Sequence, residues 1–199
     1  MTALRSITIP YGDARTWASP LDTAELAMRI RECRKASSTT SEKGQSLEQL
    51  MVWLLPHLPG FRVRAKDVFS SDHSQEIDIL VWNEKIQDGG LPSFGEKLIV
   101  ECKNWNRRVD SSDVAWFYWK MRVGGVREGI LVAAKGVTGV RERRTSAQAI
   151  LTAANGENPS VRILVITLAE IEKFTSSVDL RDLLIDKILL LTAQHALPR

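Results

Sequence analysis

The segment LIVECKNWNRRVD, residues 98–110, begins as a buried strand and ends in a basic tail that contains an aromatic residue. Side chains two residues apart in a strand share a face, so Glu101 and Lys103 point to one side of the sheet and Cys102 to the other. We therefore expect a carboxylate and an ammonium to act at one place. An exposed charge pair between neighbouring strands is the alternative.

The elements predicted around this strand form a mixed α/β layer architecture. Pro56 ends the first helix of this part of the chain, and the Gly-Gly and Pro of residues 83–96 indicate a long hairpin loop within a three-stranded meander. We expect a helix at 46–55, strands at 61–69, 76–83 and 97–104, a helix at 111–122 with Ser111 or Ser112 as its cap, a strand at 129–134, a helical stretch at 140–155, a strand at 161–168, and helices from residue 169 onward.

The first forty residues are set apart from this pattern. Residues 22–37 predict a helix with Asp22 or Thr23 at its start, and the polar residues 37–44 indicate a linker or loop. We therefore expect two parts, a helical N-terminal extension with its linker at 1–43 and the main domain at 44–199.

Composition excludes several classes of protein. The two cysteines, Cys33 and Cys102, lack the spacing of a zinc site or a disulfide framework, which favours a reducing, cytoplasmic location. No apolar run approaches the ~18–20 residues of a membrane span, so we expect no membrane partner. The net charge is +3, with a basic excess between residues 101 and 144 that could face a polyanion, solvated surface helices being the alternative.

Two further acids can join Glu101. Alternation within 76–83 puts Asp78 on a face that lies beside Glu101 if the two strands are neighbours, and Glu48 lies on an apolar helical stripe that ought to face the sheet. Three acids with oxygen ligands suit Mg²⁺ better than Zn²⁺. Taken singly, each acid could instead be an ordinary surface residue.

Residues 44–135 resemble the restriction-endonuclease-like superfamily with the PD-(D/E)xK motif, most closely its Mrr-like branch. GQSLEQLMVWLLPHLPGFRV resembles the opening helix with its Glu, SQEIDILVWN the segment that ends in the metal-binding Asp, and LIVECKNW the (Glu/Gln)-x-Lys strand. The resemblance implies a three-layer fold with a central mixed β-sheet flanked by helices. The segment before Asp78 departs from the family, which is often Gly-rich there. Glu76 in that segment is either an additional ligand or a residue that narrows substrate access.

The resemblance also implies a metal-dependent mechanism. Asp78, Glu101 and the backbone carbonyl of Cys102 would hold Mg²⁺, for which Mn²⁺ is expected to substitute, and Glu48 would reach the ion directly or through water. Lys103 would orient or deprotonate the attacking water and offset charge on the phosphate.

Basic and aromatic residues after the site are candidates for DNA contact. They are Trp105, Arg107, Arg108, Lys135, Arg141, Arg143 and Arg144. In the helix at 111–122 one stripe contains Val114, Phe117, Tyr118 and Met121, and another contains Trp116, Trp119 and Lys120. The second stripe predicts a homodimer interface or contact with the N-terminal extension.

We therefore predict a Mg²⁺-dependent endodeoxyribonuclease in restriction, antiviral defence or DNA processing, with a separate specificity or regulatory subunit as a possible partner. The alternatives are a non-cleaving nucleic-acid-binding module of the same fold, and a nuclease directed at RNA or branched DNA. Intact Glu48, Asp78, Glu101 and Lys103 argue against the binding module.

Overall fold

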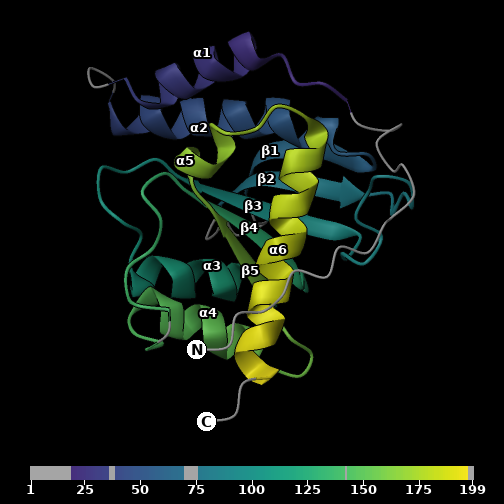
Figure 1. Cartoon of the computed structure of the whole chain (residues 1–199). Coiled ribbons are helices and arrows are strands. Elements are labelled where there is room, and N and C mark those ends of the chain that lie inside the picture. Colours follow the sequence, from purple (N-terminus) through teal and green to yellow (C-terminus); the bar gives the residue numbers. More distant parts are fainter. Residues whose placement is uncertain (1–18, 36–38, 70–75, 142, 197–199) are drawn as a thin grey trace, which may run out of the picture.

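A computed structural model describes residues 19–35, 39–69, 76–141 and 143–196 of the chain (Figure 1). Its centre is a five-stranded sheet in the order β1-β2-β3-β4-β5. The elements are α1 (Thr23–Cys33), α2 (Thr40–Leu54), the 3-10 helix η1 (Leu55–His57), β1 (Phe61–Phe69), β2 (Glu76–Asn83), β3 (Lys97–Lys103), α3 (Ser111–Val123), β4 (Glu128–Ala133), α4 (Ala147–Asn155), β5 (Arg162–Ile166), α5 (Leu168–Ile171) and α6 (Ser177–Ala196).

The sheet is mixed, as predicted. β1, β2 and β3 form an antiparallel meander, whereas β3, β4 and β5 run parallel and are joined through helices. The long loop between β2 and β3 is held by the buried side chain of Asn83, whose amide donates to the Leu91 carbonyl at 2.9 Å and whose oxygen accepts from the Lys85 N–H at 3.0 Å. The loop is also anchored by packing, because its Leu91 and Phe94 side chains are buried in the core.

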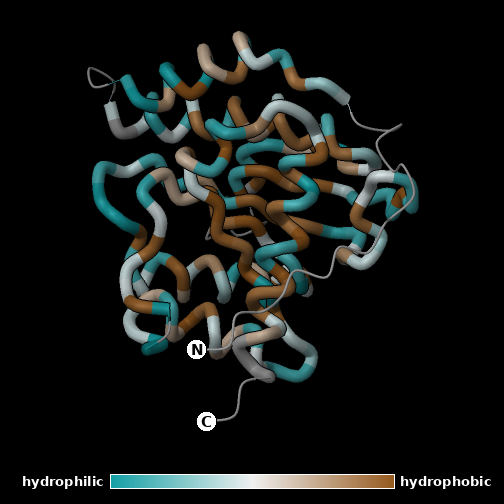
Figure 2. Tube along the Cα trace, in the orientation of Figure 1, coloured by the Kyte–Doolittle hydropathy of each residue, from teal (hydrophilic) through white to brown (hydrophobic). Residues whose placement is uncertain are grey.

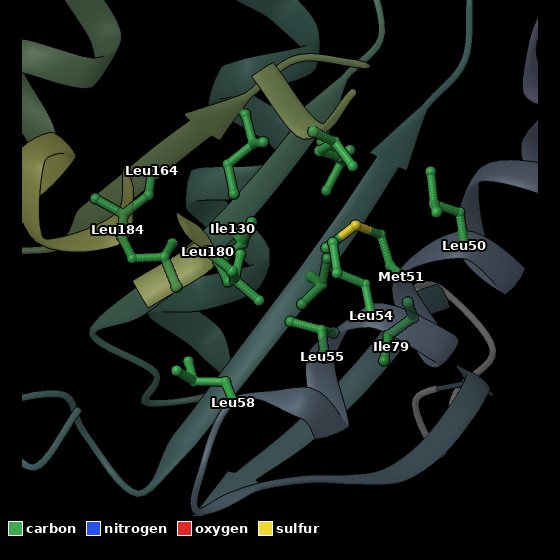
Figure 3. Close-up of a cluster of buried hydrophobic side chains, with 14 of the residues drawn as sticks. Leu50, Met51, Leu54, Leu55, Leu58, Ile79, Ile130, Leu164, Leu180 and Leu184 are labelled. Carbon is green, nitrogen blue, oxygen red and sulfur yellow. The ribbon is translucent and has the colours of Figure 1, made fainter. Parts of the chain in front are cut away.

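Helices cover both faces of the sheet and make three layers (Figure 1). α1 and α2 lie on one side with α6, and α3 and α4 lie on the other. The apolar residues concentrate in the strands between these layers (Figure 2). Figure 3 shows the larger core, in which side chains of α2 and η1 meet those of β2, β4, β5 and α6. Residues of this core labelled there include Leu50, Met51, Leu54, Ile79, Ile130, Leu164 and Leu184.

The N-terminal helices join this core. α1 buries Leu26, Ile30 and Cys33, and it lies along α2. α2 begins at Thr40, so residues 40–44, predicted as linker, are helical instead. A capping box causes the early start, because the Thr39 hydroxyl accepts from the Glu42 N–H and the Glu42 carboxylate accepts from the Thr39 N–H. The division into parts at 1–43 and 44–199 stays a prediction, since residues 1–18 and 36–38 lie outside those described.

Two local predictions were wrong. α4 begins at Ala147 rather than near residue 140, because Arg144 and Ser146 have positive φ and interrupt any helix there. The cap of α3 is Asp110 rather than Ser111 or Ser112, since the Asp110 carboxylate accepts from the Ser112 and Asp113 N–H groups.

No helix in the described part of the chain combines the length and apolar character of a membrane span.

Candidate active site

The site lies where β2 and β3 separate. Their antiparallel register ends at the pair Ile79 and Val100, and one further step brings Asp78 opposite Glu101. The ladder stops here, and the Asp78 carboxylate accepts the backbone N–H of Cys102 at 2.7 Å. Asp78 therefore takes the place of the missing strand partner, and two acids from two strands meet at one end of the pairing.

Glu101 is one of the most deeply buried charged residues described, with 2% of its surface exposed. The Nζ atom of Lys103 lies 2.7 Å from its Oε1, and the Nζ atom of Lys120 in α3 lies 2.8 Å from its Oε2. Two ammonium groups thus compensate one buried carboxylate on the face of the sheet that α3 covers.

The environment of Asp78 disfavours its charged form. Burial, followed by the negative charge of Glu101, raises the pKa of Asp78 to about 7, against the lowering effect of the Cys102 N–H and of Lys103 and Lys120. The charge of Glu101 therefore acts on Asp78, as expected for two acids at the end of the same strand pairing. A perturbed acid beside a lysine, at a strand edge, is a common arrangement in active sites.

Lys103 remains charged despite partial burial. Desolvation opposes the charge, but attraction and hydrogen bonding to Glu101 outweigh it and raise the pKa of Lys103. Its side chain is 24% exposed, and its Nζ atom lies 5.6 Å from the ring centre of Trp105. Lys103 is therefore a charged group that reaches solvent at the edge of the site.

Glu48 of α2 lies on the other side of β3. Its side chain is 14% exposed, and its Oε2 lies 2.6 Å from the Nζ atom of Lys66 in β1. Burial raises the pKa of the Cys102 thiol well above its usual value, and three carboxylates raise it further. In order of effect they are Asp78, Glu48 and Glu101. All three predicted acids therefore act on one residue of β3.

The oxygen atoms here fit a hard divalent cation held partly by water. Asp78 and Glu101 are a like-charge pair in a buried setting, and the Cys102 carbonyl leaves the strand on the same side as the N–H that Asp78 accepts. Within the described residues, no three or more His, Cys, Asp or Glu side chains lie close enough together to hold a metal ion. Glu48, paired with Lys66, is therefore outside such a cluster in this geometry.

The predicted DNA-contacting residues fall into two groups. Trp105 and Lys135 line a cavity of about 480 Å³, and Arg108, Lys135 and Arg141 line a second of about 520 Å³ that adjoins it through Lys135. Both cavities lie at the carboxyl ends of the parallel strands, where ligands bind in many α/β proteins.

The remaining candidates are placed differently. The Arg107 guanidinium lies 4.2 Å from the centre of the Trp105 ring and 3.0 Å from the Asp110 carboxylate, so it already has partners within the protein. Arg143 and Arg144 are exposed in the loop before α4 and do not line either cavity.

Lys120 was assigned to the wrong stripe of α3. It is 5% exposed and belongs to the buried face with Val114 and Phe117, whereas Trp116 and Trp119 are exposed and stack on each other with ring centres 5.0 Å apart. The spacing of three residues from Phe117 to Lys120 was the available signal, but α3 is apolar on nearly all sides, so no single stripe stood out. For Lys66, the ion-pair partner of Glu48, the sequence offered no such spacing.

The mixed sheet, the strand separation and the Asp78, Glu101 and Lys103 group define a restriction-endonuclease-like protein. The model of the Mrr catalytic domain, described as a restriction endonuclease, matches residues 40–178. The chain belongs to this family of nucleases. A search of curated proteins found no match.

Proposed function

We propose that this protein is a Mg²⁺-dependent endonuclease that hydrolyses DNA phosphodiester bonds in restriction, antiviral defence or DNA processing, in the cytoplasm. One observation carries the proposal: the buried pair Asp78 and Glu101 stands beside a charged, solvent-reaching Lys103 in a chain of the restriction endonuclease family. A binding module without chemistry gains nothing from burying two acids that repel each other.

The position of each residue in the site indicates its role. Asp78, Glu101 and the Cys102 carbonyl would hold Mg²⁺, and Glu48 would act on it through water, since its carboxylate is paired with Lys66. The bound ion would polarise the scissile phosphate and lower the pKa of water.

Lys103 reaches solvent, so it would orient the attacking water and stabilise the negative charge that grows on the phosphate. No covalent intermediate with the protein is needed.

The cationic edge of the two cavities would hold the DNA backbone. Arg108, Lys135 and Arg141 would contact phosphates there, and Trp105 would border the strand near the site. Arg107 would exchange Asp110 for phosphate, while Arg143 and Arg144 would add charge from the following loop. The expected protein partners are a second copy of this chain, with which it would form a homodimer, and a separate specificity or regulatory subunit.

A substrate panel tests this function. The full chain would be incubated with supercoiled plasmid, linear duplex, branched DNA and single-stranded RNA, each with Mg²⁺, with Mn²⁺ or with EDTA. We expect nicking or linearisation of plasmid with either metal and none with EDTA. Cleavage of RNA or of branched DNA alone would favour the corresponding alternative. DNA binding without cleavage of any substrate would contradict the nuclease and favour the binding module.

A further inference from the structure

Both oxygens of the Glu101 carboxylate are engaged by lysines. Lys103 contacts Oε1 at 2.7 Å, while Lys120 contacts Oε2 at 2.8 Å and Oε1 at 3.1 Å. Oε1 therefore has two ammonium partners for its two lone pairs, so it can bind a cation only after one lysine leaves. The question is which lysine leaves.

The two lysines differ in what else holds them. Lys103 is 24% exposed and lies at the end of β3, so its ammonium can move into water at little cost. Lys120 is 5% exposed, and its Nζ atom also donates to the backbone carbonyl of Glu76 at 2.5 Å. Moving Lys120 away would leave its charge and the Glu76 carbonyl uncompensated within the protein.

The third contact of Lys120 also joins the two strands of the site. Glu76 is the first residue of β2, two positions before Asp78, and Glu101 lies in β3. One ammonium from α3 therefore connects the strand that carries Asp78 with the side chain of Glu101. The buried neighbours Val114, Phe117 and Met121 fix the helix that supplies it.

We infer that Lys120 is a positioning residue that holds Glu101 permanently, and that Lys103 is the exchangeable lysine, which leaves Oε1 of Glu101 when a divalent cation binds. The inference rests on the proposed function. It explains why one carboxylate has two ammonium partners: the fixed one keeps Glu101 oriented and compensated, and the mobile one is released toward the substrate side of the site, where a charge near the phosphate is useful.

Lysine footprinting of the unmodified full chain tests whether Lys103 leaves Glu101 when a metal ion binds. The protein would be acetylated briefly with and without MnCl₂, and each lysine would be quantified by mass spectrometry. We expect the reactivity of Lys103 to rise by about threefold or more with metal, because a released side chain is more accessible, while Lys120 stays protected in both conditions. The exposed Lys97 at the start of β3 serves as the internal control and should not change.

The outcomes separate this inference from the proposed function. Metal-dependent cleavage with an unchanged Lys103, or with a Lys120 that becomes reactive, overturns the exchange and leaves the nuclease standing. Absence of both Mn²⁺ binding and cleavage overturns the function itself, and with it this inference.

Two variants give opposite results if Lys120 is the positioning residue. In Lys120→Met, Lys103 becomes the remaining lysine on Glu101 and is held more firmly, so the Kd for Mn²⁺ measured calorimetrically should rise by about three- to tenfold. In Lys103→Met the competitor for Oε1 is lost, and the Kd should fall. A purely structural Lys120 would lower the melting temperature without this opposite sign. Should Lys120→Met fail to fold, the footprint on the unmodified chain still decides.

Discussion

Two ends of the same sheet bury carboxylates in different ways. Glu128, at the start of β4, is 4% exposed and is satisfied by the guanidinium of Arg162 and by the Gly95 N–H at 3.1 Å. Gly95 allows this approach, because a Cβ atom there would lie 2.5 Å from a carboxylate oxygen of Glu128. This is an ion pair with one acid, one cation and one backbone donor.

The other end of the sheet, near the last residue of β3, holds two acids. Glu101 is as deeply buried as Glu128, but its neighbour is a second acid, Asp78, and two lysines compensate it instead of one arginine. Burial of a carboxylate therefore does not distinguish a site from a structural ion pair. The distinction comes from the second acid, because Glu128 is paired with one cation, whereas Glu101 acts on a second carboxylate, Asp78.

The largest expected effect separates these two glutamates. Glu101→Gln should lower the rate of DNA cleavage by roughly 10³-fold or more, because it removes both a ligand charge and the partner of Lys103. Glu128→Gln should instead lower the free energy of unfolding by about 1–3 kcal/mol, with cleavage per folded molecule nearly unchanged. Rates and denaturant melts of both variants would check this, and equal loss of activity in the two would contradict the contrast.

The next effect is a pH dependence of stability. The pKa of Asp78 is about 7 in the folded protein and lower when unfolded, so the folded state binds more protons between about pH 4 and pH 7. Stability should therefore fall as pH rises through this window and level off above it. Asp78→Asn removes this loss and should gain roughly 1–3 kcal/mol over wild type at pH 8, with the gain vanishing near pH 4.

Denaturant melts in metal-free buffer at several pH values would measure this difference. Adding Mg²⁺ at pH 8 should stabilise the wild type and leave Asp78→Asn nearly unchanged, because a ligand that binds only the folded state raises its stability. A wild type whose stability rises steadily from pH 4 to pH 8 without metal would show that folding does not raise the pKa of Asp78.

A smaller effect is expected at the cationic cavities. Lys135→Ala should weaken duplex binding about three- to tenfold and reduce the salt dependence of the affinity by about one phosphate contact. Lys97→Ala removes an exposed lysine from the opposite end of β3 and is the matched control. Fluorescence anisotropy at several salt concentrations would compare them. Equal losses of affinity in the two variants would show that the DNA does not bind at Lys135.

The smallest effect on folding is expected at the exposed tryptophans of α3. Trp116 and Trp119 are 47% and 43% exposed, so replacing both with Ser should change the free energy of unfolding by less than about 1 kcal/mol. If they form the predicted homodimer interface, light scattering should give the mass of two chains for wild type and of one for the double variant. Trp82→Ser, at an exposed tryptophan of β2, should remain dimeric. A double variant with unchanged mass would exclude this interface.

Sequence patterns predicted the part of the site that depends on strands. The strands at 61–69 and 76–83 have the predicted bounds, because alternating apolar residues between turn signals define both length and facing. The same alternation predicted that Glu101 and Lys103 share a face, and the contact between them confirms it. Asp78 joined them because consecutive strands of a meander pair with each other.

The rest of the site depends on contacts between elements distant in sequence. Lys120 reaches Glu101 only because α3 packs across β3, and a helix apolar on nearly all sides does not reveal which residues turn inward. Glu48 meets Lys66 because α2 lies near β1, and neither residue lies in a pattern that specifies the other. These ion pairs are set by packing geometry, which local periodicity does not encode.

We propose that Lys103, beside two buried acids, promotes DNA hydrolysis. The most direct measurement compares Mg²⁺-dependent nicking of supercoiled plasmid by wild type, Lys103→Met and Lys97→Met at equal concentrations of folded protein. We expect Lys103→Met to lose roughly 10²–10³-fold in rate and Lys97→Met to stay within about twofold of wild type. A Lys103→Met variant that cuts plasmid as fast as wild type would show that Lys103 is not catalytic and that the active site lies elsewhere.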